Sequence, residues 1–210
     1  MSSPQRADRN ADSPQRAVLS LRERKKAKTR RAIQEHALRM FTEQGYEATT
    51  VEQIAEAAEV SPSTLFRYFP TKEDLIVQDD YDPMLLAVMR AQPPELPPLT
   101  AIRRALHTAF AQIPPEGLDE VRVRMSLMMS VPAVRARSLD NLLTTVDLLA
   151  GVVAERSGRD RSAPAVRTFA GAVLGAMLPA LYSWAAADGT RSLPDLIDEA
   201  LALLESGLPL

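Results

Sequence analysis

The sequence predicts an all-α protein. Apolar residues recur at helical spacing along most of the chain, and helix-starting residues such as Ser, Thr and Pro precede several of these segments. A convincing alternation of apolar and polar residues, which would indicate strands, is missing, as is a repeat of fixed period. We expect about nine helices, divided into a disordered arm (1–20), a small three-helix domain (21–70) and a larger helical domain (71–210).

The first two helices are predicted from an apolar face and from capping residues. The first runs from about Arg22 to about Gly45, with one face formed by Ile33, Ala37, Met40 and Phe41. The second begins after Thr49 or Thr50. Both threonines have a suitable capping-box partner three residues later, Glu52 and Gln53 respectively, so the start stays open by one residue.

A short third helix and a fourth helix follow. Ser61 is the expected N-cap of the third, and Pro62 stands at its first position, where a missing N–H costs nothing. Thr71 is the expected cap of the fourth, which runs toward Asp82 and Pro83. There it either kinks, or a new helix begins with Asp82 as its cap.

Proline marks the start of the larger domain. A link with four prolines (91–99) precedes further helices expected near 100–112, 118–130, 138–157, 164–187 and 192–205. The last of these is amphipathic, with one apolar stripe formed by Leu193, Leu196, Ile197, Ala200, Leu201 and Leu204.

Charge is distributed unevenly along the 210 residues. The whole chain has 25 Lys+Arg and 27 Asp+Glu, a net charge of −2, which excludes a uniformly basic nucleic-acid coat. Residues 1–39 hold eleven basic and four acidic residues, a net of +7, so residues 40–210 carry −9. A basic front end of this kind indicates a polyanionic partner.

Several function classes are excluded or disfavoured by composition. There are no cysteines, which excludes disulfides, thiolate metal sites and cysteine nucleophiles. The two histidines, His36 and His107, are too far apart in the chain to suggest a metal site, and neither a G-x-S-x-G motif nor a glycine-rich phosphate loop is present. We therefore expect no enzyme activity, no cofactor and no metal. The charged first thirty residues lack a secretory signal, which favours a cytoplasmic protein.

Residues 50–69 read as helix, tight turn and short helix. The three-residue turn 59–61 is the spacing of a DNA-binding helix-turn-helix, in which the second helix enters the major groove. Outward residues of that helix could contact phosphates and base edges, and Lys72 offers a further phosphate contact. The run 22–31, with seven basic residues and one acidic residue, could reach the backbone or the minor groove. Short helices and charged faces also occur in proteins that do not bind DNA, so a protein–protein adaptor with a basic face is the alternative.

The segment Arg30–Leu75 resembles the DNA-binding domain of the TetR family of bacterial transcriptional repressors, most specifically over Val60–Leu75. The resemblance implies three helices joined by a fourth to a larger ligand-binding and dimerising helical domain. It also implies a homodimer that binds palindromic double-stranded operator DNA and releases it when a small molecule enters the larger domain.

Carried over by position, the resemblance assigns the DNA contacts. The phosphate-contacting threonine is Thr49 or Thr50, and the backbone lysine is Lys72. With Arg30 from the basic run, the predicted DNA-binding residues are Arg30, Thr49, Thr50, Ser61, Ser63, Thr64, Arg67, Tyr68 and Lys72. One departure is Glu59, which stands where the family usually has glycine in the turn. A left-handed conformation there would cost about 1 kcal/mol, and its charge would weaken DNA binding.

The larger domain has two features that bear on function. Thr168–Ala187 is twenty residues without a charge, but it is rich in Ala and Gly, so a buried helix at a subunit interface fits better than a membrane span. We expect the homodimer to form through about 164–205, where Gly171 and Gly175 permit close approach, and we expect no membrane partner.

The effector is expected to be small and apolar, or of an acyl type such as an acyl-CoA. The segment Phe66–Met84 resembles actinobacterial family members that sense acyl-CoA-like ligands. Candidate pocket residues are Phe110, Met125, Met128, Met129, Phe169 and Met177, although ordinary core positions would give the same pattern.

Four arginines form a candidate anion clamp for a charged group of the ligand, with solvated surface arginines as the alternative: Arg122, Arg124, Arg135 and Arg137. His107 is expected to be a satisfied polar residue. Ligand entry would shift the fourth helix, with Pro83 as a flex point.

Overall fold

The computed structural model describes residues 20–78, 81–187 and 191–209, with the side chains of 81–83 left aside. Within these ranges the chain forms ten helices and no strands, which confirms the predicted all-α class. In chain order the helices are α1 (Leu21–Gln44), α2 (Val51–Ala57), α3 (Pro62–Tyr68), α4 (Asp74–Val77), α5 (Tyr81–Arg90), α6 (Pro98–Ala111), α7 (Pro115–Ser130), α8 (Pro132–Ser157), α9 (Pro164–Ala186) and α10 (Leu193–Glu205). The predicted disordered arm lies almost wholly outside the described residues.

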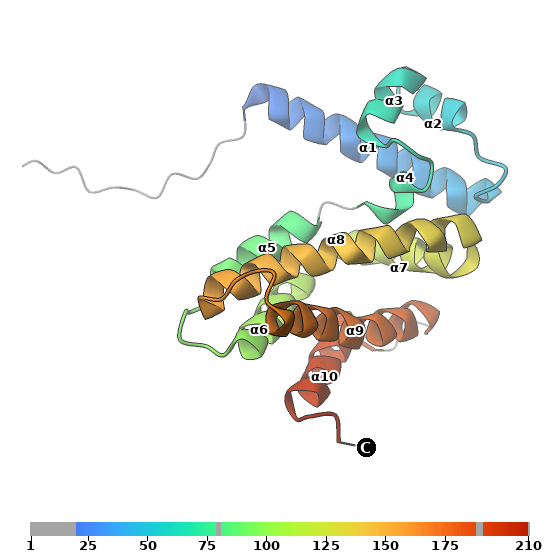
Figure 1. Cartoon of the computed structure of the whole chain (residues 1–210). Coiled ribbons are helices and arrows are strands. Elements are labelled where there is room, and N and C mark those ends of the chain that lie inside the picture. The colour runs from blue at the N-terminus through green and yellow to red at the C-terminus, as the bar shows by residue number, and fades with distance from the viewer. Residues whose placement is uncertain (1–19, 79–80, 188–190, 210) are drawn as a thin grey trace, which may run out of the picture.

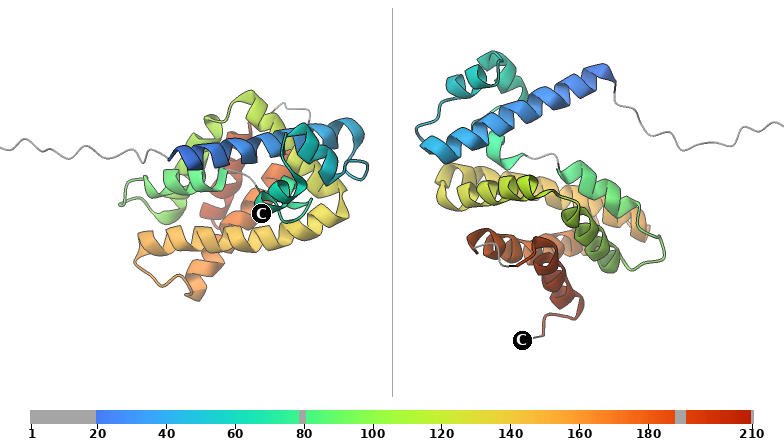
Figure 2. Two further views of the ribbon diagram at one scale, coloured as in Figure 1. Left: turned by 90° about the horizontal axis from the view of Figure 1, so that it is seen from above. Right: turned by 180° about the vertical axis from the view of Figure 1, so that it is seen from behind.

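The helices are arranged in three levels from one end of the molecule to the other (Figure 1). Helices α1, α2 and α3 form one end, and α5, α7 and α8 form the middle. Helix α6 leads from α5 toward α10, and α9 and α10 lead to the C-terminus at the opposite end. The view from behind shows the same order (Figure 2). The short α4 lies between the first level and the second, so it is the connection through which the two could communicate.

Local capping fixes the starts of the N-terminal helices. Ser20 and Glu23 form a capping box at α1. At α2 the open choice between two threonines resolves to Thr50, which accepts from the Gln53 N–H, while the Gln53 side chain accepts from the Thr50 N–H. Ser61 accepts from the Thr64 N–H at α3, and Pro62 occupies the first position, as predicted.

The fourth helix is shorter than predicted. Thr71 and Asp74 bond reciprocally, backbone N–H to side chain in both directions, at 3.1 and 3.2 Å. The following helix α4 ends at Val77 instead of running toward Asp82. Helix α5 has already begun at Tyr81, so Asp82 is not its cap, and Pro83 falls in its first turn, where proline is tolerated.

Proline sets the starts of the later helices. Helices α6, α7, α8 and α9 each have a proline at the first position, which explains why α8 begins at Pro132 and not near residue 138. Pro179 lies inside α9 without ending it. The remaining predicted boundaries agree with the structure to within a few residues.

Two hydrophobic clusters hold the described helices together. One joins α1, α2 and α3 to Leu75, Ile76 and Val77 of α4 and to Val134 at the start of α8. The other is formed by α5 to α10. The predicted boundary at residue 70 therefore separates α4 from the core to which its side chains belong.

Helix α9 is the one described helix long and apolar enough to cross a membrane. Only 28% of its most apolar 18-residue window is buried in the protomer. Core helices of soluble proteins pass the same test of length and composition, so this is weak evidence for a membrane span.

Candidate nucleic-acid interface and its connection to the helical body

Helix α3 presents a polar face to the outside and an apolar face to the first cluster. Leu65 is fully buried and Phe69 closes the helix beneath it, whereas Ser63 and Arg67 are exposed and Tyr68 is half-buried. The helix is therefore anchored by its apolar residues, and it lies at the outer end of the molecule (Figure 1). The geometry permits the end-on presentation that major-groove reading requires.

A basic cleft joins α3 to the N-terminal part of α1. Its volume is about 460 Å³, and Arg67 and Tyr68 of α3 form one wall, with the guanidinium of Arg67 5.7 Å from the Tyr68 ring centroid. The opposite wall comes from the basic run of α1. The cleft is lined by Arg22, Lys25, Lys26, Thr29, Arg67 and Tyr68. The fold thus brings together two features that lie about forty residues apart in the sequence, and four cations surround one polar groove suited to a phosphate backbone.

The turn before α3 is tight and strained at one residue. Glu59 has a φ of 53°, in the left-handed region, and its N–H donates to the carbonyl of Glu56. The Val60 N–H donates to the Ala55 carbonyl at 2.9 Å, which closes the turn. Glu59 therefore adopts the conformation for which glycine is favoured, and its exposed carboxylate stands next to the proposed DNA face.

The two candidate threonines have different environments. The side chain of Thr50 is exposed at the start of α2. Thr49 is buried, its hydroxyl lying 2.8 Å from the Gly45 carbonyl and 3.3 Å from that of Met40, and it accepts from Gln44 at 3.2 Å. Thr49 serves the loop between α1 and α2, which leaves Thr50 as the residue available to a phosphate.

Lys72 lies in a small polar cluster behind the helix-turn-helix. Its Nζ donates to the Tyr46 carbonyl at 2.5 Å and lies 4.0 Å from the ring centroid of the same residue. Partial burial lowers the pKa of Lys72, and burial together with the neighbouring Glu73 carboxylate raises that of Tyr46, whose hydroxyl donates to Glu73 at 2.8 Å. The ammonium is positioned by this cluster; its predicted phosphate contact stays a prediction.

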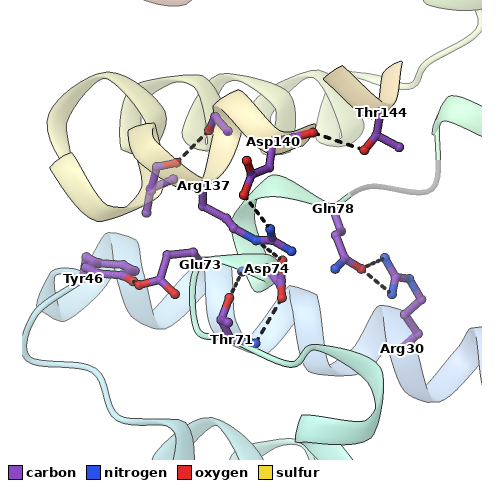
Figure 3. A network of polar contacts seen from close by, with 11 residues as sticks. Arg30, Tyr46, Thr71, Glu73, Asp74, Gln78, Arg137, Asp140 and Thr144 are labelled. Carbon is purple, nitrogen blue, oxygen red and sulfur yellow. Dashed lines mark hydrogen bonds and ion pairs between the residues drawn. The ribbon is translucent and has the colours of Figure 1, made fainter. Parts of the chain in front are cut away.

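Arg30 is directed toward the inner side of the domain. Its guanidinium lies 4.5 Å over the Phe69 ring, and both terminal nitrogens donate to the side-chain oxygen of Gln78 at 3.3 Å. Figure 3 shows this pair beside α4. Of the predicted DNA-binding residues, Arg30 is therefore engaged at the junction between the two domains.

An ion pair holds the N-terminal end of α4 to the helical body, which comprises α5 to α10. Asp74, which is fully buried, accepts from the Nε of Arg137 on α8 at 2.9 Å (Figure 3). Burial alone would raise the pKa of Asp74. Hydrogen bonds from Arg137, Thr71 and Gln78 outweigh that effect, so the pKa lies below its ordinary value. The carboxylate is thus ionised at neutral pH and bound from both domains.

A second arginine holds the C-terminal end of α4. Arg124 of α7 is 5% exposed, and one of its terminal nitrogens donates to the carbonyls of Leu75, Ile76 and Gln78 at 3.3, 2.7 and 3.0 Å. Gln34 of α1 donates to the Gln78 carbonyl as well, at 2.5 Å. We call Arg124, Arg137 and the α4 groups that they bind the α4 clamp. Arginines from two helices of the body thus hold both ends of one four-residue helix.

The predicted anion clamp is not formed. Arg122 stacks on Trp184, Arg124 and Arg137 bind α4, and Arg135 donates to the Met129 carbonyl. The alternative of solvated surface arginines is also wrong for Arg124, which is buried. Sequence reasoning missed the role of Arg124 because its partners are backbone carbonyls about fifty residues away in the chain.

The six predicted pocket residues are dispersed. Met177 lines a small apolar cavity of about 60 Å³ between α5, α6, α8 and α9. Phe110 lines a different pocket, Met125 and Phe169 pack against the C-terminal cluster, and Met128 packs against the N-terminal one. Met129, the sixth, is half-buried near the end of α7. Met177 is thus the one predicted residue in the 60 Å³ cavity. The walls of that cavity are formed by Leu85, Leu86, Met89, Leu106, Thr145, Leu148, Leu149, Val173, Leu174 and Met177.

The described residues contain no group of three or more metal-binding side chains of the His, Cys, Asp or Glu type. His107 is exposed, with its Nε2 3.7 Å from the Asp195 carboxylate.

Comparison with known families agrees with this arrangement. The family model described as bacterial regulatory proteins, tetR family, matches residues 33–78, which include the helix-turn-helix and α4. The model described as the MftR C-terminal domain matches residues 96–209, more than half of the chain. The chain belongs to the TetR family. This TetR-family chain is accordingly a transcriptional regulator and not an enzyme.

Two curated relatives of this TetR-family regulator are informative. It is 36% identical to the transcriptional regulator TcmR of Streptomyces glaucescens over 67% of this chain, an alignment that spans 65% of TcmR. It is 27% identical to the putative mycofactocin biosynthesis regulator MftR of Mycobacterium tuberculosis over 88% of this chain and 93% of that protein.

Solved structures share the fold. FadR of Thermus thermophilus, a TetR-family repressor in complex with lauroyl-CoA, has a TM-score of 0.56 at 24% identity, covering 86% of this chain and 95% of that one. FadR of Bacillus halodurans gives 0.58 at 21% identity, covering 86% and 96%.

Proposed function

We propose that this regulator is a cytoplasmic repressor that binds a palindromic operator as a homodimer and releases it when a small apolar or acyl-type effector binds. The observation that carries the proposal is the basic cleft, in which four cations of α1 and α3 meet beside the exposed face of the recognition helix. Cations in this number would neutralise several phosphates, while Arg67 could address a guanine edge.

An uncovered apolar surface supports the homodimer. Gly171 and Gly175 of α9 have open space where a side chain would begin, and Leu203 of α10 is 52% exposed. A second copy of α9 and α10 would cover these residues and bring two recognition helices to one DNA duplex. A shared helical interface explains why an uncharged helix is only partly buried in one protomer.

The apolar cavity between α5 and α9 supports an apolar effector. Its walls are almost entirely aliphatic, but its volume of about 60 Å³ is well below the roughly 300 Å³ of ordinary ligand pockets. In the described conformation this cavity is too small for such a ligand, and an acyl chain would enter only if α5 moved away from α8 and α9. Because α5 is the next helix after α4, such a movement would displace α4 and with it the recognition domain formed by α1, α2 and α3.

Mobility-shift experiments with DNA flanking the gene test the proposal. We expect a salt-dependent, sequence-specific shift, weakened about tenfold or more by Arg67→Ala or Tyr68→Ala, since a specific base contact is worth about 1–3 kcal/mol. Arg104→Ala, which removes an exposed arginine of α6 in the body, is the matched control and should bind normally. The absence of any shift at low salt would contradict the proposal and favour a protein–protein adaptor.

A further inference from the structure

A second and larger cavity lies where the ends of four helices of the body meet. Its volume is about 560 Å³, and it is bounded by α6, α7, α9 and α10. Phe110, Ile113, Trp184 and Leu193 are buried side chains in its walls, each less than 10% exposed. The cavity is open to solvent and of a size ordinary for a small-molecule site. Its accessible apolar lining comes from Ala111, Pro115 and Leu118, since the four buried side chains offer little surface.

One cation of this cavity is held rigidly. The guanidinium of Arg122 lies 4.3 Å over the Trp184 ring, and its Nη1 donates to the carbonyls of Ala187 at 2.6 Å and Trp184 at 3.3 Å. Among the described residues, these contacts use one nitrogen and one face of the group, so Nε and Nη2 keep their N–H donors for a ligand. A planar guanidinium fixed in this way suits the two oxygens of a carboxylate.

The rest of the charge around the cavity is mixed. Arg191, a second cation of the lining, is paired with Glu199 at 2.5 Å, and Asp119 of α7 is an acid of the lining. Helix α10, thirteen residues long, begins at the cavity, and its cap residue Ser192 makes no side-chain capping bond there. The positive end of this helix is offset by Asp195 in its first turn, so Arg122 is the cation on which binding of an anion would depend.

We infer that this cavity binds a small apolar carboxylic acid in its anionic form, with the carboxylate on Arg122 and the hydrocarbon against Ala111, Pro115 and Leu118. A neutral apolar molecule would leave the donors of Arg122 unused, and a small inorganic anion would leave the apolar wall uncovered. A guanidinium beside an apolar wall therefore favours a molecule that has both a carboxylate and a hydrocarbon part.

The site is connected to the α4 clamp through α7. Arg122 and Arg124 are two residues apart on this helix, so a ligand bound to Arg122 contacts the same helix whose Arg124 binds the carbonyls of α4. The acid would therefore act as an effector. This regulatory part rests on the proposed function, whereas the binding itself does not.

Trp184 is the chain's one tryptophan, so its fluorescence reports on this cavity directly. The probe is octanoate, below its micelle concentration, titrated into the full-length protein with excitation at the red edge of tryptophan absorption. We expect a saturable change in emission, and an affinity about tenfold or more weaker for 1-octanol, which lacks the charge. Calorimetric titration provides a second readout that does not depend on the fluorophore.

Three variants locate the binding. Arg122→Gln should weaken octanoate binding about tenfold or more in both readouts, with unchanged helix content by circular dichroism. Arg104→Gln, an exposed arginine elsewhere in the body, should leave it unchanged. Leu174→Phe, which fills the smaller apolar cavity, should also leave it unchanged. Equal binding of octanoate and octanol, or loss of binding in Leu174→Phe alone, would overturn the inference.

The operator experiment separates this inference from the proposed function. Octanoate is expected to weaken operator binding by the wild type and not by Arg122→Gln. A protein that binds its operator but gives no Trp184 response retains the proposed function and refutes the acid site. A protein that binds octanoate through Arg122 but no DNA has the site and refutes the proposed function. Octanoate binding through Arg122 that leaves operator affinity unchanged would refute the effector role.

Discussion

The recognition domain (α1 to α3) and its junction with the body (α5 to α10) are stabilised by contacts between residues at different separations in the sequence. In the recognition domain, side chains cap helices three residues away, as in the pairs Ser20–Glu23, Thr50–Gln53 and Ser61–Thr64. At the junction, Arg124 and Arg137 reach α4 across 48 and 63 residues of sequence. The recognition domain is thus specified locally, whereas its position depends on a few long-range polar contacts that a change in the body could alter.

The largest effect is expected from removing the arginine at the C-terminal end of α4. Arg124→Met keeps an unbranched apolar stem but leaves three buried or half-buried carbonyls without their charged donor. Since a hydrogen bond to a charged group is worth about 1.5–3 kcal/mol, we expect a loss of about 3 kcal/mol of unfolding free energy. Guanidinium denaturation followed by circular dichroism measures it. Arg104→Met, at an exposed site, should cost less than about 0.5 kcal/mol, and a similar value for Arg124→Met would contradict the clamp.

The ion pair at the other end of α4 should have a smaller, pH-dependent effect. Arg137→Ala leaves the buried Asp74 carboxylate without its charged partner. Arg137 itself is 39% exposed, so we expect a loss of about 2 kcal/mol at pH 7, below the value for a fully buried pair. Asp140→Ala, which removes the exposed second partner of Arg137, is the matched control and should cost little.

The pH dependence of this loss follows from the pKa of Asp74. In the wild type the pKa is lowered on folding, so its contribution is present above the unfolded pKa of about 3.9 and is lost as pH falls through the folded value. In Arg137→Ala the charged partner that helps to lower the folded pKa is missing, so the variant loses less of this contribution on acidification. The stability difference between the two proteins should therefore shrink as pH falls from about 5 toward 3. A stability difference that stays constant over this range would argue against the ion pair.

The sequence was informative where structure depends on neighbouring residues. Ser61 and Pro62 define the start of α3, and the left-handed backbone of Glu59 is foreseen from the family resemblance, which places a glycine there. The same reasoning could not distinguish Thr49 from Thr50, because both have a suitable partner three residues later. Burial decides between them, and burial depends on where the loop between α1 and α2 packs.

The sequence was less informative where a side chain binds a distant backbone. Arg124 and Arg122 look alike in the sequence, yet one is buried against α4 and the other stacks on Trp184. The methionines of α7 suggest a pocket by composition. Their directions around the helix, however, place Met125 and Met128 in two different clusters. Such assignments need the packing of the helices, which periodicity within one helix does not contain.

The two threonines before α2 provide a test that separates local stability from DNA contact. Thr49→Val removes a buried hydroxyl with partners at Gly45 and Gln44, so we expect a loss of about 1.5 kcal/mol of unfolding free energy and operator affinity within about twofold of wild type. Thr50→Val removes the cap of α2, at a cost of about 1 kcal/mol, and also weakens operator binding. Denaturation and mobility shifts on both variants check this. Equal operator affinities for the two would indicate that neither hydroxyl contacts DNA.

The smallest effect on stability is expected at Glu59, where two local effects can be separated. Glu59→Gly relieves about 1 kcal/mol of left-handed strain but increases the freedom of the unfolded chain, for a net gain of about 0.5 kcal/mol. Glu59→Gln keeps the strain and removes only the charge, so its stability should equal that of wild type. Both variants should bind operator more tightly, because a negative charge beside the phosphates is lost, and the gain should shrink at high salt. If only the glycine variant binds more tightly, then backbone strain, and not charge, limits how the turn fits DNA.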